Sequence, residues 1–129
     1  MSMPALFKNR LSIPVIGSPL FIISGPELVI AQCKAGVVGS FPALNARPAA
    51  LLDDWLAQIK EELAAHDKAH PDRLSAPFAV NQIVHKSNNR LDQDLALCEK
   101  HKVQMMITSL GAREELNQAA HAWASCFTT

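Results

Sequence analysis

Thiols, imidazoles and one carboxamide near a predicted strand end are the groups of this 129-residue chain that could support chemistry. Cys98 and His101 stand three residues apart in a predicted helix, a spacing at which both could reach one metal ion. No second pair of ligands accompanies them, and the other histidines are scattered at positions 66, 70, 85 and 121. A buried thiol beside a solvent-exposed histidine is therefore favoured over a zinc site.

The segment at residues 19–23, Pro-Leu-Phe-Ile-Ile, is unusually apolar for a loop. Such bulk could pack under a flat aromatic ligand or, equally, against a neighbouring helix or a partner subunit. Asn81 lies at the end of a later predicted strand, where its carboxamide could both donate and accept hydrogen bonds toward a bound heterocycle. The alternative for Asn81 is that it completes a turn, which is the commoner role for asparagine at a strand end.

The familiar catalytic and nucleotide-binding motifs do not occur in the sequence. Neither G-x-G-x-x-G nor G-x-x-x-x-G-K-[ST] is present, so neither a dinucleotide fingerprint nor a phosphate-binding loop is predicted. No Ser/His/Asp or Cys/His triad can be assembled, and no carboxylate lies at a predicted strand end. The missing carboxylates argue against a receiver-type open sheet, which needs acidic residues at those ends to hold magnesium.

Composition indicates a single globular domain. Apolar residues make up 49% of the chain and charged residues 19%, and basic and acidic residues number 12 each. With no net charge, the protein is not expected to bind nucleic acid or an anionic membrane. The three cysteines are odd in number and widely spaced, which favours a reducing compartment, the cytoplasm. We predict neither a signal peptide nor a membrane helix, and hence a soluble protein.

Strand and helix patterns alternate along the chain. Short apolar runs predict strands at residues 13–16, 37–40, 78–82 and 103–109. Helical patterns follow them at residues 26–35, about 48–69, 90–101 and 112–123. Ser24 and Glu27 match an S-x-x-E capping box for the first helix, and Gly36 supplies its C-terminal stop.

Four strand–helix units in succession predict an α/β fold with a parallel sheet, because parallel neighbours need crossover connections. One candidate is an open, flavodoxin-like doubly wound sheet, which a chain of this length could complete. The other is the N-terminal half of a TIM (β/α)8 barrel, truncated after about four units, since a whole barrel needs about 250 residues. The missing strand-end carboxylates favour the half barrel. In both folds, ligands bind at the carboxyl ends of the strands.

Three longer segments resemble the N-terminal part of the nitronate monooxygenase family, formerly called 2-nitropropane dioxygenases. They read PVIGSPLFIISGPELVIAQCKAGVVGSFPALNARP, PFAVNQIVHKSNNRLDQDLALCEKHKV and ITSLGAREELNQAAHAW. Within them, SGPELVIAQCKAGVVGS is similar to the family's P-E-L-x-x-A-x-x-x-A-G-G-x-G segment, and FAVN is similar to its F-G-V-N strand. Ala79 replaces the usual glycine, and Val37 stands where many members have a second glycine.

The resemblance implies a flavoprotein oxidoreductase built on a TIM barrel that holds FMN non-covalently at its C-terminal face. Members of the family oxidise alkyl nitronates with dioxygen to carbonyl compounds and nitrite. By position, the loop at residues 19–21 would lie against the isoalloxazine ring. The cofactor-binding residues implied are Pro19, Leu20, Phe21, Asn81 and, as weaker candidates, Thr108 and Ser109. No catalytic residue and no metal ligand is assigned.

The resemblance ends at Trp123. The family continues with a segment like W-G-I-V-L-H-D-V, whereas this chain reads W-A-S-C-F-T-T. A one-base shift in a plausible coding sequence for G-I-V-L-H-D-V-I gives A-S-C-F-T-T and a stop. We therefore interpret residues 1–123 as a partial FMN-binding barrel and residues 124–129 as an unrelated tail that matches neither a strand nor a helix, produced by a change of reading frame. Resequencing the gene tests this interpretation.

Loss of the second half of the barrel would remove the loops that hold the FMN phosphate and the histidine expected in catalysis. The chain alone is therefore expected to bind FMN weakly or not at all, to be inactive, and to self-associate through the unpaired edges of its first and fourth strands. Two alternatives remain. One is a non-catalytic half-barrel module that binds a flavin or a phosphorylated ligand, with two chains pairing into a ring. The other is an FMN-dependent enoyl-thioester reductase that uses NAD(P)H.

Overall fold

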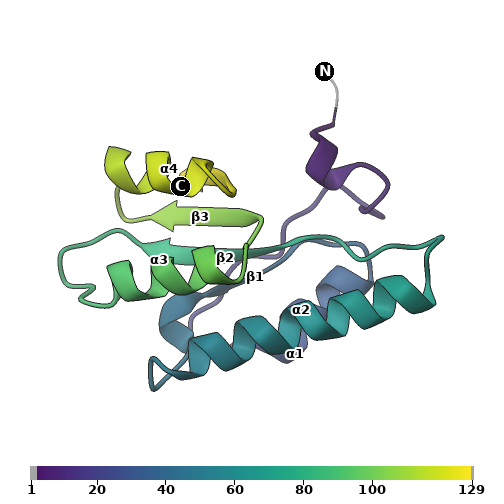
Figure 1. Cartoon of the computed structure of the whole chain (residues 1–129), viewed down its shortest axis with the longest axis horizontal. Coiled ribbons are helices and arrows are strands. Elements are labelled where there is room, and N and C mark those ends of the chain that lie inside the picture. The colour runs from purple at the N-terminus through teal and green to yellow at the C-terminus, as the bar shows by residue number, and fades with distance from the viewer. Residues whose placement is uncertain (1–2, 129) are drawn as a thin grey trace.

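The computed structural model describes residues 3–128, with side chains up to residue 126. Its helices are α1 (Pro26–Lys34), α2 (Leu51–Ala69), α3 (Leu91–Lys100) and α4 (Glu114–His121), and two single 3-10 turns are η1 (Ala5–Phe7) and η2 (Ala43–Asn45). Its strands are β1 (Gly39–Pro42), β2 (Phe78–Ile83), β3 (Met105–Ser109) and β4 (Ser125–Thr128) (Figure 1). The chain is therefore a mixed α/β protein, as the alternating patterns predict.

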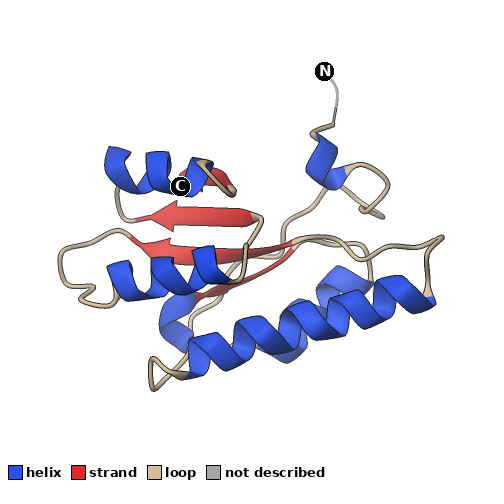
Figure 2. Ribbon diagram, in the orientation of Figure 1, coloured by secondary structure: helices blue, strands red, loops and turns tan. Residues whose placement is uncertain are grey.

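The four strands form one parallel sheet in the order β1-β2-β3-β4. Figure 2 shows β2 and β3 side by side with their arrowheads pointing the same way. Each strand thus lies next to the strand that precedes it in the sequence. A flavodoxin-like sheet would instead insert the first predicted strand, residues 13–16, between β1 and β2. The structure pairs β1 directly with β2, so the doubly wound alternative is wrong.

The helices cover one face of the sheet, where the main core lies. Phe41, Val80 and Met106 point from β1, β2 and β3 into a cluster to which all four helices contribute. The long helix α2 buries its residues at helical spacing, Leu52, Leu56, Ile59 and Leu63. Gly39 allows α1 to approach β1, because a Cβ atom there would lie 2.7 Å from the Val29 carbonyl oxygen.

The opposite face of the sheet carries the alternate side chains of the same strands. Val38, Ala79 and Met105 form a second, smaller core with Ile107. Leu6, Phe7 and Leu11 of the N-terminal segment pack against this cluster. Figure 1 shows that segment on the other side of the sheet from α1 and α2. Among the described residues, this segment covers the part of the face near the amino ends of the strands, and the part near the carboxyl ends opens into a cavity.

The predicted buried strand at residues 13–16 is wrong. Only Ile16 pairs, in an isolated parallel bridge with Val38, and Ile13, Val15 and Ile16 are 44–50% exposed. Pro14 has no N–H to donate to a ladder, and the Val15 N–H is turned back to the carbonyl of Ile13. This stretch therefore forms a short edge segment and not a buried strand.

The capping box predicted for the first helix is also wrong. The N-cap residue of α1 is Gly25, with Pro26 at the first helical position. The Ser24 hydroxyl instead accepts the N–H of Leu20, within the preceding loop. The predicted stop is confirmed, because α1 ends just before Gly36, whose φ of 81° lies in the left-handed region.

The predicted tail contains a strand. Ser125–Thr128 form β4, which pairs in parallel with β3, so the expectation that these residues match no element and leave β3 at an open edge is wrong. Cys126 packs against the main core with Trp123, and its thiol donates to Oδ1 of Asn117. Residue 129 lies outside the described residues, and the origin of the tail in a frame change stays a prediction. Among the described helices, none combines the length and apolarity needed to cross a membrane.

Candidate ligand-binding site

A cavity of about 600 Å³ opens at the carboxyl ends of the strands, on the face that the helices do not cover. The register of the parallel sheet places the residues of the cavity floor side by side: Pro42 lies beside Asn81, and Asn81 lies beside Ile107. Ile83 and Ser109 form the next row of the same face. The full lining comprises Ile16, Ser18, Pro19, Phe21, Pro42, Leu44, Asn81, Ile83, Ile107, Ser109 and Leu110. A cavity of this size with mostly apolar walls is typical of a small-molecule site.

The apolar loop supplies one wall of the cavity, as the sequence suggests. Pro19 and Phe21 line it, and Phe21 is 59% exposed toward that open side. The guanidinium of Arg47 lies 5.4 Å from the centre of the Phe21 ring. Leu20, which was also predicted to contact a ligand, does not line the cavity.

Asn81 faces the cavity but has fewer free hydrogen-bonding groups for a ligand than the sequence suggests. Its Nδ2 group donates to the carbonyl oxygen of Ile107 and to Oγ of Ser109, both at 3.0 Å. Both amide hydrogens are therefore used inside the protein. Among the side chains and backbone groups described, none donates to its Oδ1, so Asn81 can act toward a ligand only as an acceptor.

Thr108 and Ser109 point to opposite faces of the sheet. Ser109 lines the cavity, where its Oγ accepts from Asn81 and its hydroxyl hydrogen remains available to a ligand. Thr108 is fully buried and does not line the cavity, so the structure does not bring this predicted residue to the site. Side chains alternate along a strand, and only one of two neighbours can face the same cavity.

Cys98 and His101 serve structural roles away from this cavity. Burial raises the pKa of Cys98 to about 12, and Nε2 of Gln82 donates to its sulfur. His101 is only 15% exposed and donates from Nε2 to Asp53, so the expectation of a solvent-exposed histidine is wrong. Hydrogen bonds from His101 and Lys100 hold the pKa of Asp53 below its usual value.

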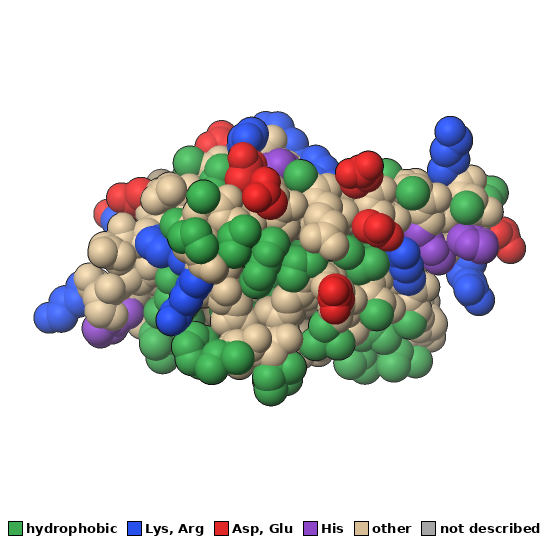
Figure 3. Space-filling model, turned by 90° about the horizontal axis from the view of Figure 1, so that it is seen from below, with side chains coloured by type: hydrophobic (Ala, Val, Ile, Leu, Met, Phe, Trp, Pro, Cys, Tyr) green, Lys and Arg blue, Asp and Glu red, His purple; other side chains and the backbone are tan. Residues whose placement is uncertain are grey.

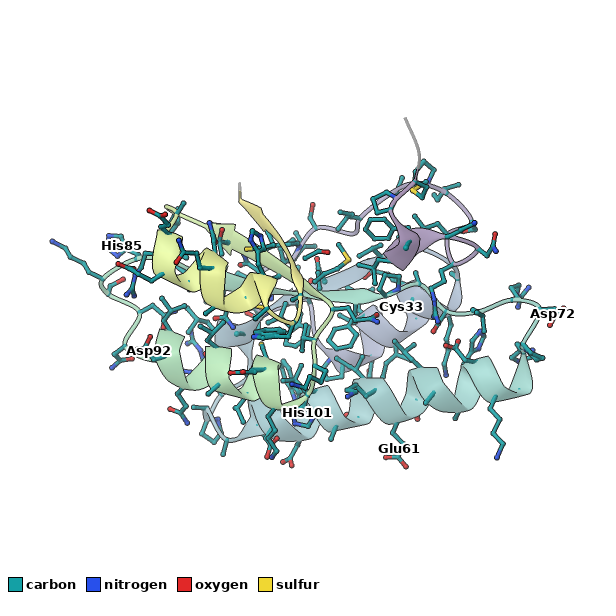
Figure 4. All side chains as sticks on the ribbon, turned by 45° about the horizontal axis from the view of Figure 1, so that its top comes forward. Cys33, Glu61, Asp72, His85, Asp92 and His101 are labelled. Atoms are coloured by element: carbon teal, nitrogen blue, oxygen red, sulfur yellow. The ribbon has the colours of Figure 1, made fainter. Side chains whose placement is uncertain are left out.

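The remaining ionisable side chains are dispersed. Figure 4 shows His85 and Asp92 at one end of the molecule, Asp72 at the other end and Cys33 in the interior. Burial raises the pKa of Cys33 to about 11, so this thiol is not a ready nucleophile near neutral pH. Within the described part of the chain, no cluster of three or more His, Cys, Asp or Glu side chains could hold a metal ion.

Several wall residues were not predicted from the sequence. Pro42 is the last residue of β1 and Leu44 lies in η2, and Ile83 and Ile107 share the open face with Asn81. Strand alternation from Asn81 could have identified Ile83, two residues later on the same face. No protein-family model matches the chain, and no curated protein matches it. The assignment of a function therefore depends on the geometry of this cavity and on the resemblance described above.

Proposed function

We propose that this chain is the N-terminal half of a TIM-type barrel whose cavity receives the isoalloxazine ring of FMN, in an oxidoreductase of the nitronate monooxygenase type. The observation that carries the proposal is the position of the cavity. It lies at the carboxyl ends of parallel strands, where barrel enzymes bind their ligands, and its walls include Phe21 and Asn81 from the segments expected to contact the flavin.

Sheet topology supports the half barrel. A barrel adds each strand next to the previous one and keeps all its helices outside, so strand order is sequential and one face is helix-free. Both features hold here, since the order is β1-β2-β3-β4 and all four helices contribute to the core on one face. In a closed barrel, Ala79, Met105 and Ile107 on the other face would meet side chains from the remaining strands.

The cavity walls suit a flat, largely neutral ring. Oδ1 of Asn81 could accept an N–H of the ring, and the hydroxyl of Ser109 could donate to a ring carbonyl or nitrogen. Apolar walls from Pro19, Phe21 and Ile107 would exclude water from one side of the ring. A bound flavin would supply the electron-transfer chemistry, and the chain would orient it.

The same walls do not suit the phosphate of FMN. Among the described residues, no Lys, Arg or His side chain lines the cavity. The ring would therefore be bound without an anchor for the phosphate, which agrees with the expectation of weak FMN binding. In this proposal the phosphate site and the group that acts on the nitronate belong to the other half of the barrel.

A flavin titration tests the proposal. Amide shifts of the isotope-labelled chain should change at Phe21, Asn81 and Ser109 on addition of riboflavin, with a dissociation constant in the high micromolar range or weaker. FMN should bind no more tightly than riboflavin. Shifts that avoid these residues, or a strong preference for FMN, would contradict the proposal. In a chain extended to a full barrel, nitrite release from propionate 3-nitronate tests the activity, and NADH oxidation with an enoyl thioester tests the reductase alternative.

We also propose that the chain self-associates. Large apolar side chains are exposed at Ile13, Val15, Ile16, Leu20, Phe21, Ile22, Ile23 and Leu110. Figure 3 shows hydrophobic patches between the charged side chains on one face of the molecule. Exposed apolar surface of this kind marks contact sites or aggregation. Sedimentation at increasing concentration should show species larger than a monomer, and a monomer throughout would contradict this.

We also propose a cytoplasmic location, because the three cysteines are free thiols and a reducing compartment keeps thiols free.

A further inference from the structure

One carboxamide organises the apolar loop next to the cavity. Asn45, the last residue of η2, accepts the N–H of Ile22 on Oδ1 at 3.0 Å. Its Nδ2 group donates to the carbonyl oxygens of Leu20, at 3.0 Å, and Ser24, at 2.8 Å. The acceptor and both amide hydrogens of Asn45 are thus directed to three backbone groups within one five-residue stretch.

The loop needs such an anchor, because its own conformation is unfavourable. Ile22 has a φ of 70°, a left-handed conformation that is strained for a β-branched residue. Ile22 and Ile23 are 80% and 69% exposed, so burial of their side chains contributes little to holding the loop. The hydrogen bond from the Leu20 N–H to the Ser24 hydroxyl closes the base of the loop. Asn45 hydrogen-bonds to both ends of the loop, at Leu20 and Ser24, and to its tip, at Ile22.

The position of Phe21 follows from this anchor. Phe21 lies between Leu20 and Ile22, whose backbone groups both bond to Asn45, and its side chain lines the cavity. Arg47, two residues after Asn45, places its guanidinium 5.4 Å from the Phe21 ring. The segment after β1, through Asn45 and Arg47, therefore holds in place the loop whose Phe21 side chain forms part of the cavity wall.

We propose that Asn45 is a positioning residue that holds Phe21 in the wall of the ring-binding cavity, and this rests on the proposed flavin function. Without the three hydrogen bonds, the loop would sample other conformations, and only a fraction would present Phe21 correctly. Apparent affinity falls in proportion to that fraction. If one molecule in ten keeps the loop closed, riboflavin binding weakens about tenfold.

A double-mutant cycle with Phe21 tests the proposal on the whole chain. Asn45→Ala should weaken riboflavin binding about tenfold in the native background and less than twofold in the Phe21→Ala background, because the positioned group is then absent. Asn89→Ala, at an exposed asparagine outside the cavity, should leave affinity unchanged. An equal loss in both backgrounds, or no loss in either, would overturn the proposal.

Two further measurements keep the result interpretable. Asn45→Asp preserves size and the acceptor for the Ile22 N–H but turns a carboxylate oxygen toward the carbonyl oxygens of Leu20 and Ser24, so it should also weaken riboflavin binding and serves as the test if Asn45→Ala does not fold. If the native chain binds no riboflavin, the flavin function fails, and the aromatic resonances of Phe21 still report on the anchor. Those resonances should shift and broaden in Asn45→Ala but not in Asn89→Ala, and unchanged Phe21 resonances would overturn the positioning role.

Discussion

Replacing Arg90 with methionine should strongly destabilise the protein, because Arg90 is the partner of a buried carboxylate. Its Nη2 group donates to Oδ1 of Asp94 at 3.1 Å, and the Asp94 side chain is completely buried. The same guanidinium donates to the carbonyl oxygens of Ala43 and Ala46, in and beside the η2 turn. Arg90→Met would leave all three acceptors without this partner.

The expected loss is about 3–5 kcal/mol at neutral pH, the range for breaking a buried ion pair by removing one partner. For a domain of this size, that lowers the melting temperature by roughly 10–20 °C. Asp94→Leu together with Arg90→Met removes both charges and should recover most of the loss. Asp94→Asn alone should cost about 1–3 kcal/mol, since it keeps an acceptor for the Arg90 guanidinium, whose side chain is 17% exposed, but removes the charge that pairs with it.

The stability of the Arg90→Met variant should depend on pH in a definite direction, which thermal melts can check. Burial raises the pKa of Asp94, and the hydrogen bond and charge of Arg90 oppose this. Without Arg90 the pKa rises further, so the folded variant binds a proton more tightly than the unfolded chain. Its stability should then fall as pH rises above the ordinary Asp value, and its deficit should be smallest near pH 4. A deficit that is independent of pH, or a double variant no better than Arg90→Met, would refute the buried-charge reasoning.

Two other substitutions probe the packing and the charge pairs. Gly39→Ala should lose about 1–3 kcal/mol in chemical denaturation, because its Cβ would lie 2.7 Å from the Val29 carbonyl oxygen; a native midpoint would contradict this close approach. Burial alone would raise the pKa of Asp67, but hydrogen bonds from Ser75 and Arg10 hold it below its usual value. Asp67→Asn should therefore lower the melting temperature at pH 7, and the difference should shrink as pH falls below the ordinary Asp value; a constant difference would show that the charge is not involved.

The fold could be predicted from the sequence where periodicity is long or strongly punctuated. The long helix α2 and the stop at Gly36 depend on local patterns, and the structure contains both. The predictions of a strand at residues 13–16 and of a capping box at Ser24 failed because competing local effects decided both conformations. The N–H of Leu20 donates to the Ser24 hydroxyl, which is then not available to cap the helix, and Pro14 has no N–H to continue a strand ladder. Strand β4 was missed because four residues are too short to show an alternation, although pairing with β3 suffices to order them.

The site was predictable in its location but not in its details. The rule that ligands bind at the carboxyl ends of parallel strands points to the loops beside this cavity, and Phe21, Asn81 and Ser109 line it. Which hydrogens of Asn81 remain free depends on its neighbours across the sheet, which the sequence does not reveal. The role of Asn45 depends on the loop passing within hydrogen-bond reach, and no local pattern indicates that contact.

The most direct test of the ring-binding cavity is the detection of magnetisation transfer between riboflavin and the labelled chain. We predict nuclear Overhauser effects from the methyl groups of the isoalloxazine ring to Phe21 and to the methyl groups of Ile83 and Ile107, which line the same cavity. Contacts confined to a second cavity, whose lining includes Lys86 and Arg113, or no contacts with Phe21 and Ile107 at saturating riboflavin, would contradict this prediction.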